Sequence, residues 1–198
     1  ELKRESSPLD TRVGVDLPGT NVFREPVALF DQLQTVFRDT YSYTPGGISP
    51  LTQRQDDEKL LVKLDWNINN NHRLTLRNNY VNARDDQGIS RSAGSFSFAN
   101  RQYVFRSRQN SFTAQLNSTI GDDMFNEARF VYTRIRDERD VQDAAFPEIT
   151  LDLGGGDEIG AGIGRFNQAN RLDQDLFELT NDFTYITGDH TLTVGTSN

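Results

Sequence analysis

The sequence of 198 residues contains no cysteine, and this absence excludes several kinds of site. A disulfide-bonded scaffold, a thiolate metal centre and a cysteine nucleophile all require thiols. An excess of positive charge is also missing, because 21 basic and 29 acidic residues give a formal net charge of −8. Since binding to a phosphate backbone depends on basic side chains, we expect no nucleic-acid partner.

Long hydrophobic runs are absent as well. Mean hydropathy is −0.65, and no segment approaches the ~20 consecutive apolar residues that a transmembrane helix needs. A low mean does not exclude a transmembrane β-barrel, because only alternate residues face lipid and long loops dilute the average. No signal peptide is in view. The first residue is not Met and a strand pattern runs almost to residue 198, so we interpret the sequence as a piece of a longer chain.

Alternation of apolar and polar residues predicts about six antiparallel strands in three hairpins, near residues 59–82, 102–136 and 172–196. Each hairpin turns through a short polar segment, and long glycine-spotted segments separate the hairpins. The short turns are Asn69–Asn71, Gly121–Asp123 and Thr187–Asp189, and the long segments are residues 83–100 and 137–171. Short turns at one end and long loops at the other are typical of an all-β, up-and-down transmembrane β-barrel with long extracellular loops. Residues 59–198 would form part of such a barrel.

Residues 1–58 are expected to form a loop region that contains one short helix near residues 26–40. Pro26 suits the first turn of a helix. An apolar stripe at helical spacing follows, made of Leu29, Phe30, Leu33, Val36 and Phe37. We expect this stripe to pack on the rest of the loop rather than on the membrane. Residues 1–7 could be the end of an earlier strand, but the segment is too short to decide.

The alternation assigns an apolar face to lipid and a polar face to the barrel interior. The apolar row includes Leu64, Leu76, Leu116, Phe130 and Leu192, and residues 103–110, polar on both faces, would extend beyond the bilayer. Trp66, Phe125, Phe183 and Tyr185 would form an aromatic girdle near the short turns. The lumen-facing candidates are Lys63, Asp65, Arg73, Arg77, Glu127, Arg129, Glu178 and Asp182. These charges could line a polar lumen or contact a plug, although most are expected to pair across strands, at about 0.2–1 kcal/mol each.

No motif indicates a catalytic, cofactor or metal site, so we expect no enzymatic activity. His72 and His190 each follow a hairpin turn, and we attribute them to turn chemistry rather than to a shared metal site. Residues 154–164 are glycine-rich but lack the Gly-Lys-Ser/Thr ending of a phosphate loop. The loops contain five aromatic residues that could stack on an extracellular cargo or equally pack the loops against each other. These ligand-binding candidates are Tyr41, Tyr43, Phe96, Phe98 and Tyr103.

Several segments resemble the barrel of Oar-like TonB-dependent outer-membrane receptors. The matching residues are Lys63–Asn69, His72–Thr75, Asn79–Val81, Phe125–Glu127, Tyr132–Asp137, Arg165–Phe166, Ala169–Asn170, Leu172–Asp175, Asn181–Tyr185 and Gly188–Thr191. The resemblance covers residues from about 56 onward, rests on strand and turn motifs, and is silent on cargo. It implies a barrel of about 22 strands in the bacterial outer membrane, with an N-terminal plug and a TonB box that lie outside these residues.

The resemblance further implies that the protein captures an extracellular cargo and moves it across the membrane, driven by the TonB–ExbB–ExbD complex. Outer-membrane lipid would be the other partner. A passive porin remains an alternative. So does a soluble or cell-surface β-sandwich, acting as a binding module or adhesin without transport, because its strands also alternate. Long strands and the asymmetry of loop lengths favour the barrel.

Overall fold

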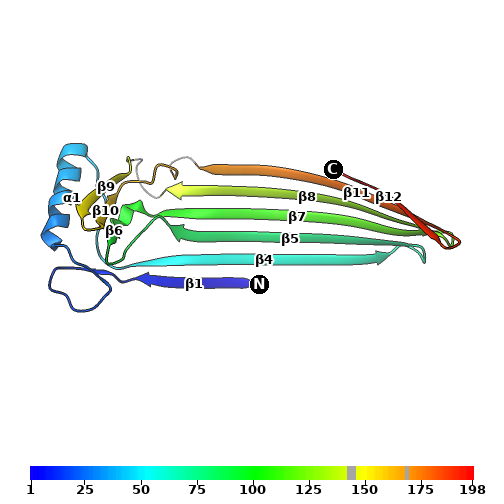
Figure 1. Ribbon diagram of the computed structural model, residues 1–198, viewed down its shortest axis with the longest axis horizontal. Coiled ribbons are helices and arrows are strands. Elements are labelled where there is room, and N and C mark those ends of the chain that lie inside the picture. Colours follow the sequence, from blue (N-terminus) through cyan, green and yellow to red (C-terminus); the bar gives the residue numbers. More distant parts are fainter. Residues whose placement is uncertain (142–145, 168–169) are drawn as a thin grey trace.

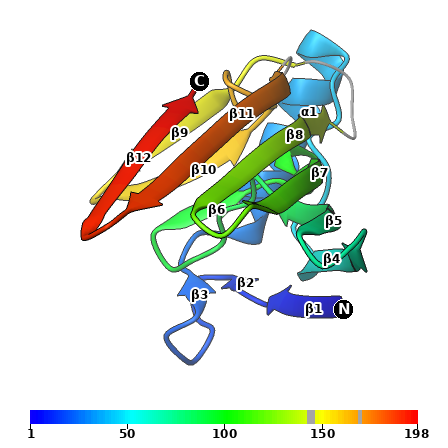
Figure 2. The same cartoon turned by 90° about the vertical axis from the view of Figure 1, so that its right-hand side faces the viewer.

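The computed structural model describes residues 1–141, 146–167 and 170–198, and its main element is a seven-stranded antiparallel sheet (Figure 1). The strands follow one another in the order β1-β4-β5-β7-β8-β11-β12, so the up-and-down prediction is confirmed. Their bounds are β1 Leu2–Leu9, β4 Leu51–Asn67, β5 His72–Gln87, β7 Tyr103–Ile120, β8 Met124–Val141, β11 Arg171–Thr187 and β12 His190–Ser197. Seen along the strands, the sheet is curved and open, with β1 and β12 at its edges (Figure 2).

All three predicted hairpins are present, and each turns where the polar segment predicted it. Gly121 and Gly188 have φ values of 67° and 56° in two of these turns. Such positive angles carry little cost for glycine, which has no Cβ, and they suit the tight turns that join antiparallel strands.

The strands are longer than the alternation predicted, because they continue where both faces become polar. Strand β1 pairs with the first part of β4, from Leu2 opposite Glu58 to Leu9 opposite Leu51. The expected loop region of residues 1–58 therefore contains β1, a strand that the sequence left open, and residues 51–58 of β4, which were wrongly expected to be loop. Strands β5 and β8 likewise extend to Gln87 and Val141, into segments predicted as loop. Hydrogen bonds between backbones hold these ends, and they need no hydrophobic face.

The register of the sheet confirms that the predicted apolar and polar residues lie on opposite faces. One row crosses five strands through Leu64, Leu76, Ala114, Phe130 and Leu179. The adjacent row crosses the same strands through Asp65, Thr75, Gln115, Arg129 and Thr180. Because directly paired residues project to the same side of a sheet, one face is apolar throughout this region and the other is polar.

The height of the apolar face matches a bilayer. On β7 the apolar row runs from Phe112 to Ile120, and at about 3.4 Å per residue this distance is roughly 27 Å. A transmembrane β-strand tilted by about 45° needs roughly 9–11 residues to cross the bilayer, and the segment from Phe112 to Ile120 has nine. Large side chains of this row are exposed, as a lipid-facing surface requires; Leu64 keeps 57% of its accessible surface.

The predicted aromatic girdle needs one correction. Phe183 pairs with Val194 and Tyr185 with Leu192 on the apolar face, as predicted. Phe125, in contrast, pairs with Thr119 and Thr184 and so lies on the polar face. Met124, the first residue of β8, lies on the apolar face, because it pairs with Tyr185. Phe125 is the next residue along the strand and therefore projects to the opposite face.

The long loops form a separate structure at the end of the sheet opposite the short turns (Figure 1). We call the described residues of these loops, 10–50, 88–102 and 146–167, the cap. The cap contains helix α1 Val27–Tyr41, the short 3₁₀ helix η1 Ala99–Arg101, and the strands β2 Arg12–Val13, β3 Val22–Phe23, β6 Ser95–Ser97, β9 Ile149–Gly154 and β10 Asp157–Ala161. Among the described residues, no helix combines the length and apolarity needed to cross a membrane.

We predict that arginine is tolerated at Thr75 and not at Leu76, although the two residues are neighbours on β5. Arginine at Leu76 would face the bilayer interior and should lower the free energy of unfolding by about 2–4 kcal/mol. Arginine at Thr75 would face the polar side and should cost less. Folding into lipid vesicles, followed by denaturant titration of the full-length protein, measures both values. Equal losses in the two variants would contradict the assigned faces.

Candidate functional site: the cap and the polar face of the sheet

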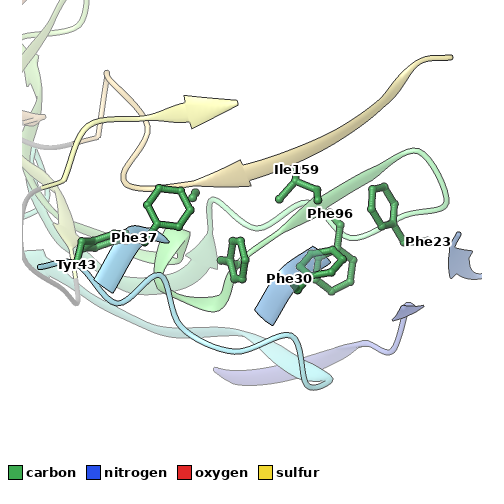
Figure 3. Packing of buried hydrophobic residues seen from close by; sticks show 8 residues of the cluster. Phe23, Phe30, Phe37, Tyr43, Phe96 and Ile159 are labelled. Carbon is green, nitrogen blue, oxygen red and sulfur yellow. The ribbon is translucent and has the colours of Figure 1, made fainter. Parts of the chain in front are cut away.

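One aromatic core joins all three loops of the cap (Figure 3). Phe30 of α1 makes edge-on contacts with Phe96 and Phe98 of the second loop, with ring centroids 5.3 and 5.6 Å apart. The buried cluster comprises Phe23, Phe30, Phe37, Tyr43, Phe96, Phe98, Ile159 and Ala161. Since edge-on aromatic pairs add about 0.5–1.5 kcal/mol beyond burial, the three loops stabilise one another as a single unit.

Helix α1 packs its apolar stripe on this core, as predicted. Phe30 and Phe37 are buried seven residues apart, two turns of helix, on the same side. Leu29 and Leu33 pack beside them. Val36 was wrongly included in the stripe, because its side chain is 51% exposed.

The chain reverses at the end of α1 and brings another aromatic residue back onto the core. Ser42 has a φ of 52°, and its N–H donates to the Arg38 carbonyl oxygen over 3.0 Å. The N–H of Tyr43 donates to the Phe37 carbonyl oxygen over 3.1 Å. This left-handed cap is a common way to end a helix. It places Tyr43 edge-on to Phe37 and stacked on Phe146, with ring centroids 3.9 Å apart.

Four of the five aromatic ligand-binding candidates are packing residues. Phe96 and Phe98 are fully buried, and Tyr43 and Tyr103 are only 4% and 6% exposed. Their rings are covered by the cap, so they present no free face on which a cargo could stack. Tyr41 is the exception, because 57% of its surface is exposed. It therefore stays a candidate for contact with an extracellular ligand.

Arg91 ties the polar backbone of two loops together. Its guanidinium donates to the carbonyl oxygens of Ser97, Gly47 and Ser49, over 3.3 Å for the first and 3.2 Å for the second. The guanidinium carbon lies 4.7 Å from the centroid of the Phe96 ring. Burial lowers the pKa of Arg91 from its usual value, but an arginine stays charged in proteins. The bound carbonyls and the ring compensate this buried charge.

A second polar link joins the loop before β7 to the loop after β8. The carboxylate of Glu148 pairs with Arg101, and its other oxygen accepts from the N–H of Arg165 over 3.2 Å. Gly160 makes room for this pair, since a Cβ there would lie 2.1 Å from Nη1 of Arg101. The N–H of Phe98 donates to the Gly160 carbonyl oxygen over 2.9 Å, and β6 pairs with β10 in parallel. Sequence reasoning missed these links, because no periodicity marks them.

The eight charged candidates on the strands all lie on the polar face of the sheet, by the register described above. Asp65 is the centre of one group: it accepts from Thr75 Oγ1 over 2.7 Å and pairs with Lys63 at 2.9 Å and Arg73 at 3.2 Å. Arg129 pairs with Glu178 at 3.2 Å. Asp65, Arg73, Arg129 and Glu178 thus pair across strands as expected, whereas Lys63 pairs within its own strand, β4. Within the described part of the chain, no ion pair involves the remaining three, Arg77, Glu127 and Asp182.

Two hollows open on this polar face. One, of about 430 Å³, is lined by Lys63, Asp65, Arg77 and Arg129 among others. The other, of about 740 Å³, lies near the short turns and is rich in asparagine. Its lining includes Arg73, Glu127 and Asp182. The arrangement offers charges of both signs to a polar partner, whether water, a plug or a cargo.

The described residues contain no group of three or more histidine, cysteine or acidic side chains placed to hold a metal ion. His72 begins β5 and His190 begins β12, and strands β7, β8 and β11 separate these two in the sheet. The structure therefore does not bring the two histidines together.

Comparison with known protein families gives a match over most of the chain. A family model described as an outer membrane beta barrel domain matches residues 27–198, which include α1, six strands of the sheet and most of the cap. No curated protein and no solved structure shows significant similarity to the chain. Ala169, one of the residues on which the resemblance to Oar-like receptors rests, lies outside the described residues.

We predict that Arg91→Ala loosens the cap and leaves the sheet intact. The change leaves buried carbonyl oxygens without a donor, at about 1–3 kcal/mol for each unsatisfied group. Limited proteolysis should then cut the cap loops faster than in the wild type, while the gel mobility of the folded barrel stays unchanged. Arg38→Ala is the control, because the Arg38 side chain forms an exposed pair with Asp39 and such pairs contribute little. Equal cleavage rates in both variants would contradict the role of Arg91.

Proposed function

The chain belongs to the outer membrane beta barrel domain family, and from this premise we propose that it forms part of a TonB-dependent receptor and transporter. The family places the protein in the bacterial outer membrane. The proposed receptor captures an extracellular ligand with the cap and passes it inward through the barrel. The resemblance to Oar-like receptors supports this assignment, and the family match supports its barrel.

The observation that carries the proposal is the shared core of the cap. Three loops, separated in sequence by strands of the sheet, bury one aromatic cluster at one end of the barrel wall. Flexible loops would lose conformational entropy each time they bound a ligand, whereas the loops of the folded cap are already ordered. A preorganised surface at the mouth of a barrel suits ligand capture better than simple diffusion.

The polar face of the sheet supports the second half of the proposal. This face carries both paired charges, such as Asp65 with Lys63, and charges such as Arg77 that form no ion pair within the described residues. Such a mixture suits a wall that contacts a plug or a passing cargo. The open edges at β1 and β12 are proposed to pair with further strands, because unpaired backbone groups are costly in lipid. The proposed energy source is the TonB–ExbB–ExbD complex, which would bind through a TonB box preceding a plug.

An adhesin in the outer membrane is the second candidate function, since a rigid cap could also bind a surface without transport. The β-sandwich alternative is wrong, because in the described part of the chain no second sheet covers the apolar face. Leu64 and Leu179 on that face stay exposed. We further propose that the protein acts without catalysis. The chemical class of the cargo stays open.

We predict that the cap faces the cell exterior and the short turns face the periplasm. The chain has no cysteine, so single cysteines at Asn70 and Ala93 can be labelled cleanly. Both positions are exposed, one in a short turn and one in the cap. On intact cells an impermeant maleimide should label the cysteine at position 93 and not the one at position 70. The reverse pattern would invert the topology. After permeabilisation both should react.

We predict that the full-length protein binds the periplasmic domain of TonB. Isothermal titration of that domain into the detergent-solubilised receptor should give saturable binding, because an energised transporter must contact its motor. Arg91→Ala, which alters only the cap, should bind TonB as the wild type does. An adhesin or a passive porin would show no binding, and that result would remove the transport proposal while leaving the membrane location intact.

A further inference from the structure

The lipid-facing side of the sheet changes character at the cap end. On strand β7 the apolar row ends at Phe112, and the next residues on the same face are Asn110, Arg108 and Arg106. Arginines of β5 and β8 adjoin them in the same rows. We call this group the arginine belt: Arg84, Arg106, Arg108, Arg134 and Arg136. It lies directly beyond the apolar band, at the height where lipid headgroups meet a membrane protein.

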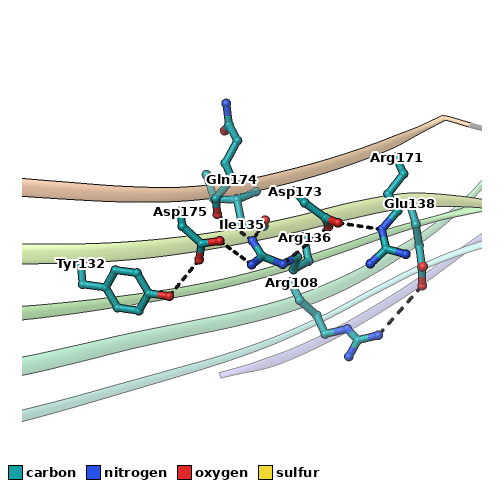
Figure 4. A network of polar contacts seen from close by, with 9 residues as sticks. All are labelled: Arg108, Tyr132, Ile135, Arg136, Glu138, Arg171, Asp173, Gln174 and Asp175. Carbon is teal, nitrogen blue, oxygen red and sulfur yellow. Dashed lines mark hydrogen bonds and ion pairs between the residues drawn. The ribbon is translucent and has the colours of Figure 1, made fainter.

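Two pairs of like charges face each other in this belt. Arg84 is directly opposite Arg106, and Arg108 is directly opposite Arg136. Like charges in directly opposite positions destabilise a sheet. An acidic residue lies directly opposite four of the five arginines on their other side: Asp56 faces Arg84, Glu138 faces Arg106, Asp175 faces Arg134 and Asp173 faces Arg136. Arg136 pairs with Asp175 at 2.6 Å and with Asp173 at 3.5 Å (Figure 4). Arg108 has no acidic residue directly opposite it, because it lies between Asn82 and Arg136.

The compensation is weakest at the centre of the belt. Arg108 reaches Glu138 only at 4.0 Å, and its side chain is 61% exposed (Figure 4). Arg134 is exposed, and no ion pair involves it in the described ranges of the chain. A hollow of about 380 Å³ opens beside them, lined by Arg4, Arg84, Arg106 and Arg108, and also by Asp56 and Glu58. The hollow therefore carries four positive and two negative side chains.

We propose that the arginine belt binds the phosphate groups of anionic lipids in the membrane leaflet nearest the cap. A phosphate between opposed guanidiniums relieves their repulsion, and arginine binds phosphate through two parallel hydrogen bonds. The aliphatic parts of the side chains lie over the last apolar row while their heads reach the headgroup layer. The inference rests on the location of the barrel in the outer membrane and is independent of transport.

Titration of phosphatidylglycerol into the full-length protein, in neutral detergent micelles, tests the proposal. Native mass spectrometry counts the bound lipids and gives their dissociation constant. Each arginine near an anionic lipid surface contributes about fivefold to affinity, so R106Q/R108Q should bind about 25-fold more weakly. The control is R77Q/R129Q on the polar face, which should bind as the wild type does. Equal weakening in both double variants would overturn the proposal.

Thermal unfolding adds a second test, which depends on the direction of the change in stability. In neutral detergent R106Q/R108Q should unfold close to the wild type, because the change removes two like-charge contacts together with the weak exposed pairs of Arg106 with Asp140 and Arg108 with Glu138. With phosphatidylglycerol the wild type should gain stability and the variant should not. If the double variant fails to fold, R134Q gives the same lipid test, with an expected loss of about fivefold. Wild-type binding that inorganic phosphate reproduces and competes away would indicate an adventitious ion only and would overturn the lipid assignment.

Discussion

Hydrocarbon offers no partner to a backbone N–H or C=O group, and this constraint shapes the chain from residue 51 onward. Each strand crossing the bilayer must bond to a neighbour on both sides, which is why β4, β5, β7, β8 and β11 run side by side in one continuous ladder. Alternation of side chains then follows from the pleat. Apolar rows such as Leu76, Ala114 and Phe130 face lipid, and the interleaved polar rows face the opposite side.

The same ladder explains what the sequence could predict and what it could not. Inside the bilayer, apolar and polar residues alternate along each strand. The hairpins, and the faces on which Lys63, Arg129 and Asp182 lie, could therefore be predicted from this pattern. Beyond the bilayer the backbone still pairs, but water on both sides removes any demand for alternation. The segments Leu51–Glu58 and Asp137–Val141 therefore resembled loops although they are strands.

The cap was the least predictable part, since its contacts join residues far apart in sequence. From the sequence, Phe96 and Phe98 could equally stack on a cargo or pack the loops against each other. Both rings are buried because α1 covers them from one loop and Ile159 from another. No local signal tells which distant segment will cover an aromatic residue. The helix itself was predictable, because Phe30 and Phe37 have helical spacing.

The parallel pairing of β6 with β10 has a consequence for how this protein can diversify. Two loops that share a ladder and an aromatic cluster cannot change length independently, because a shift of one residue in Phe96 would displace Ile159, its partner in the register. New recognition properties would then arise by substitution at solvent-facing positions of α1, such as Val36 and Tyr41. The cap would act as a conserved frame with an interchangeable outer surface, much as a rigid scaffold presents variable side chains.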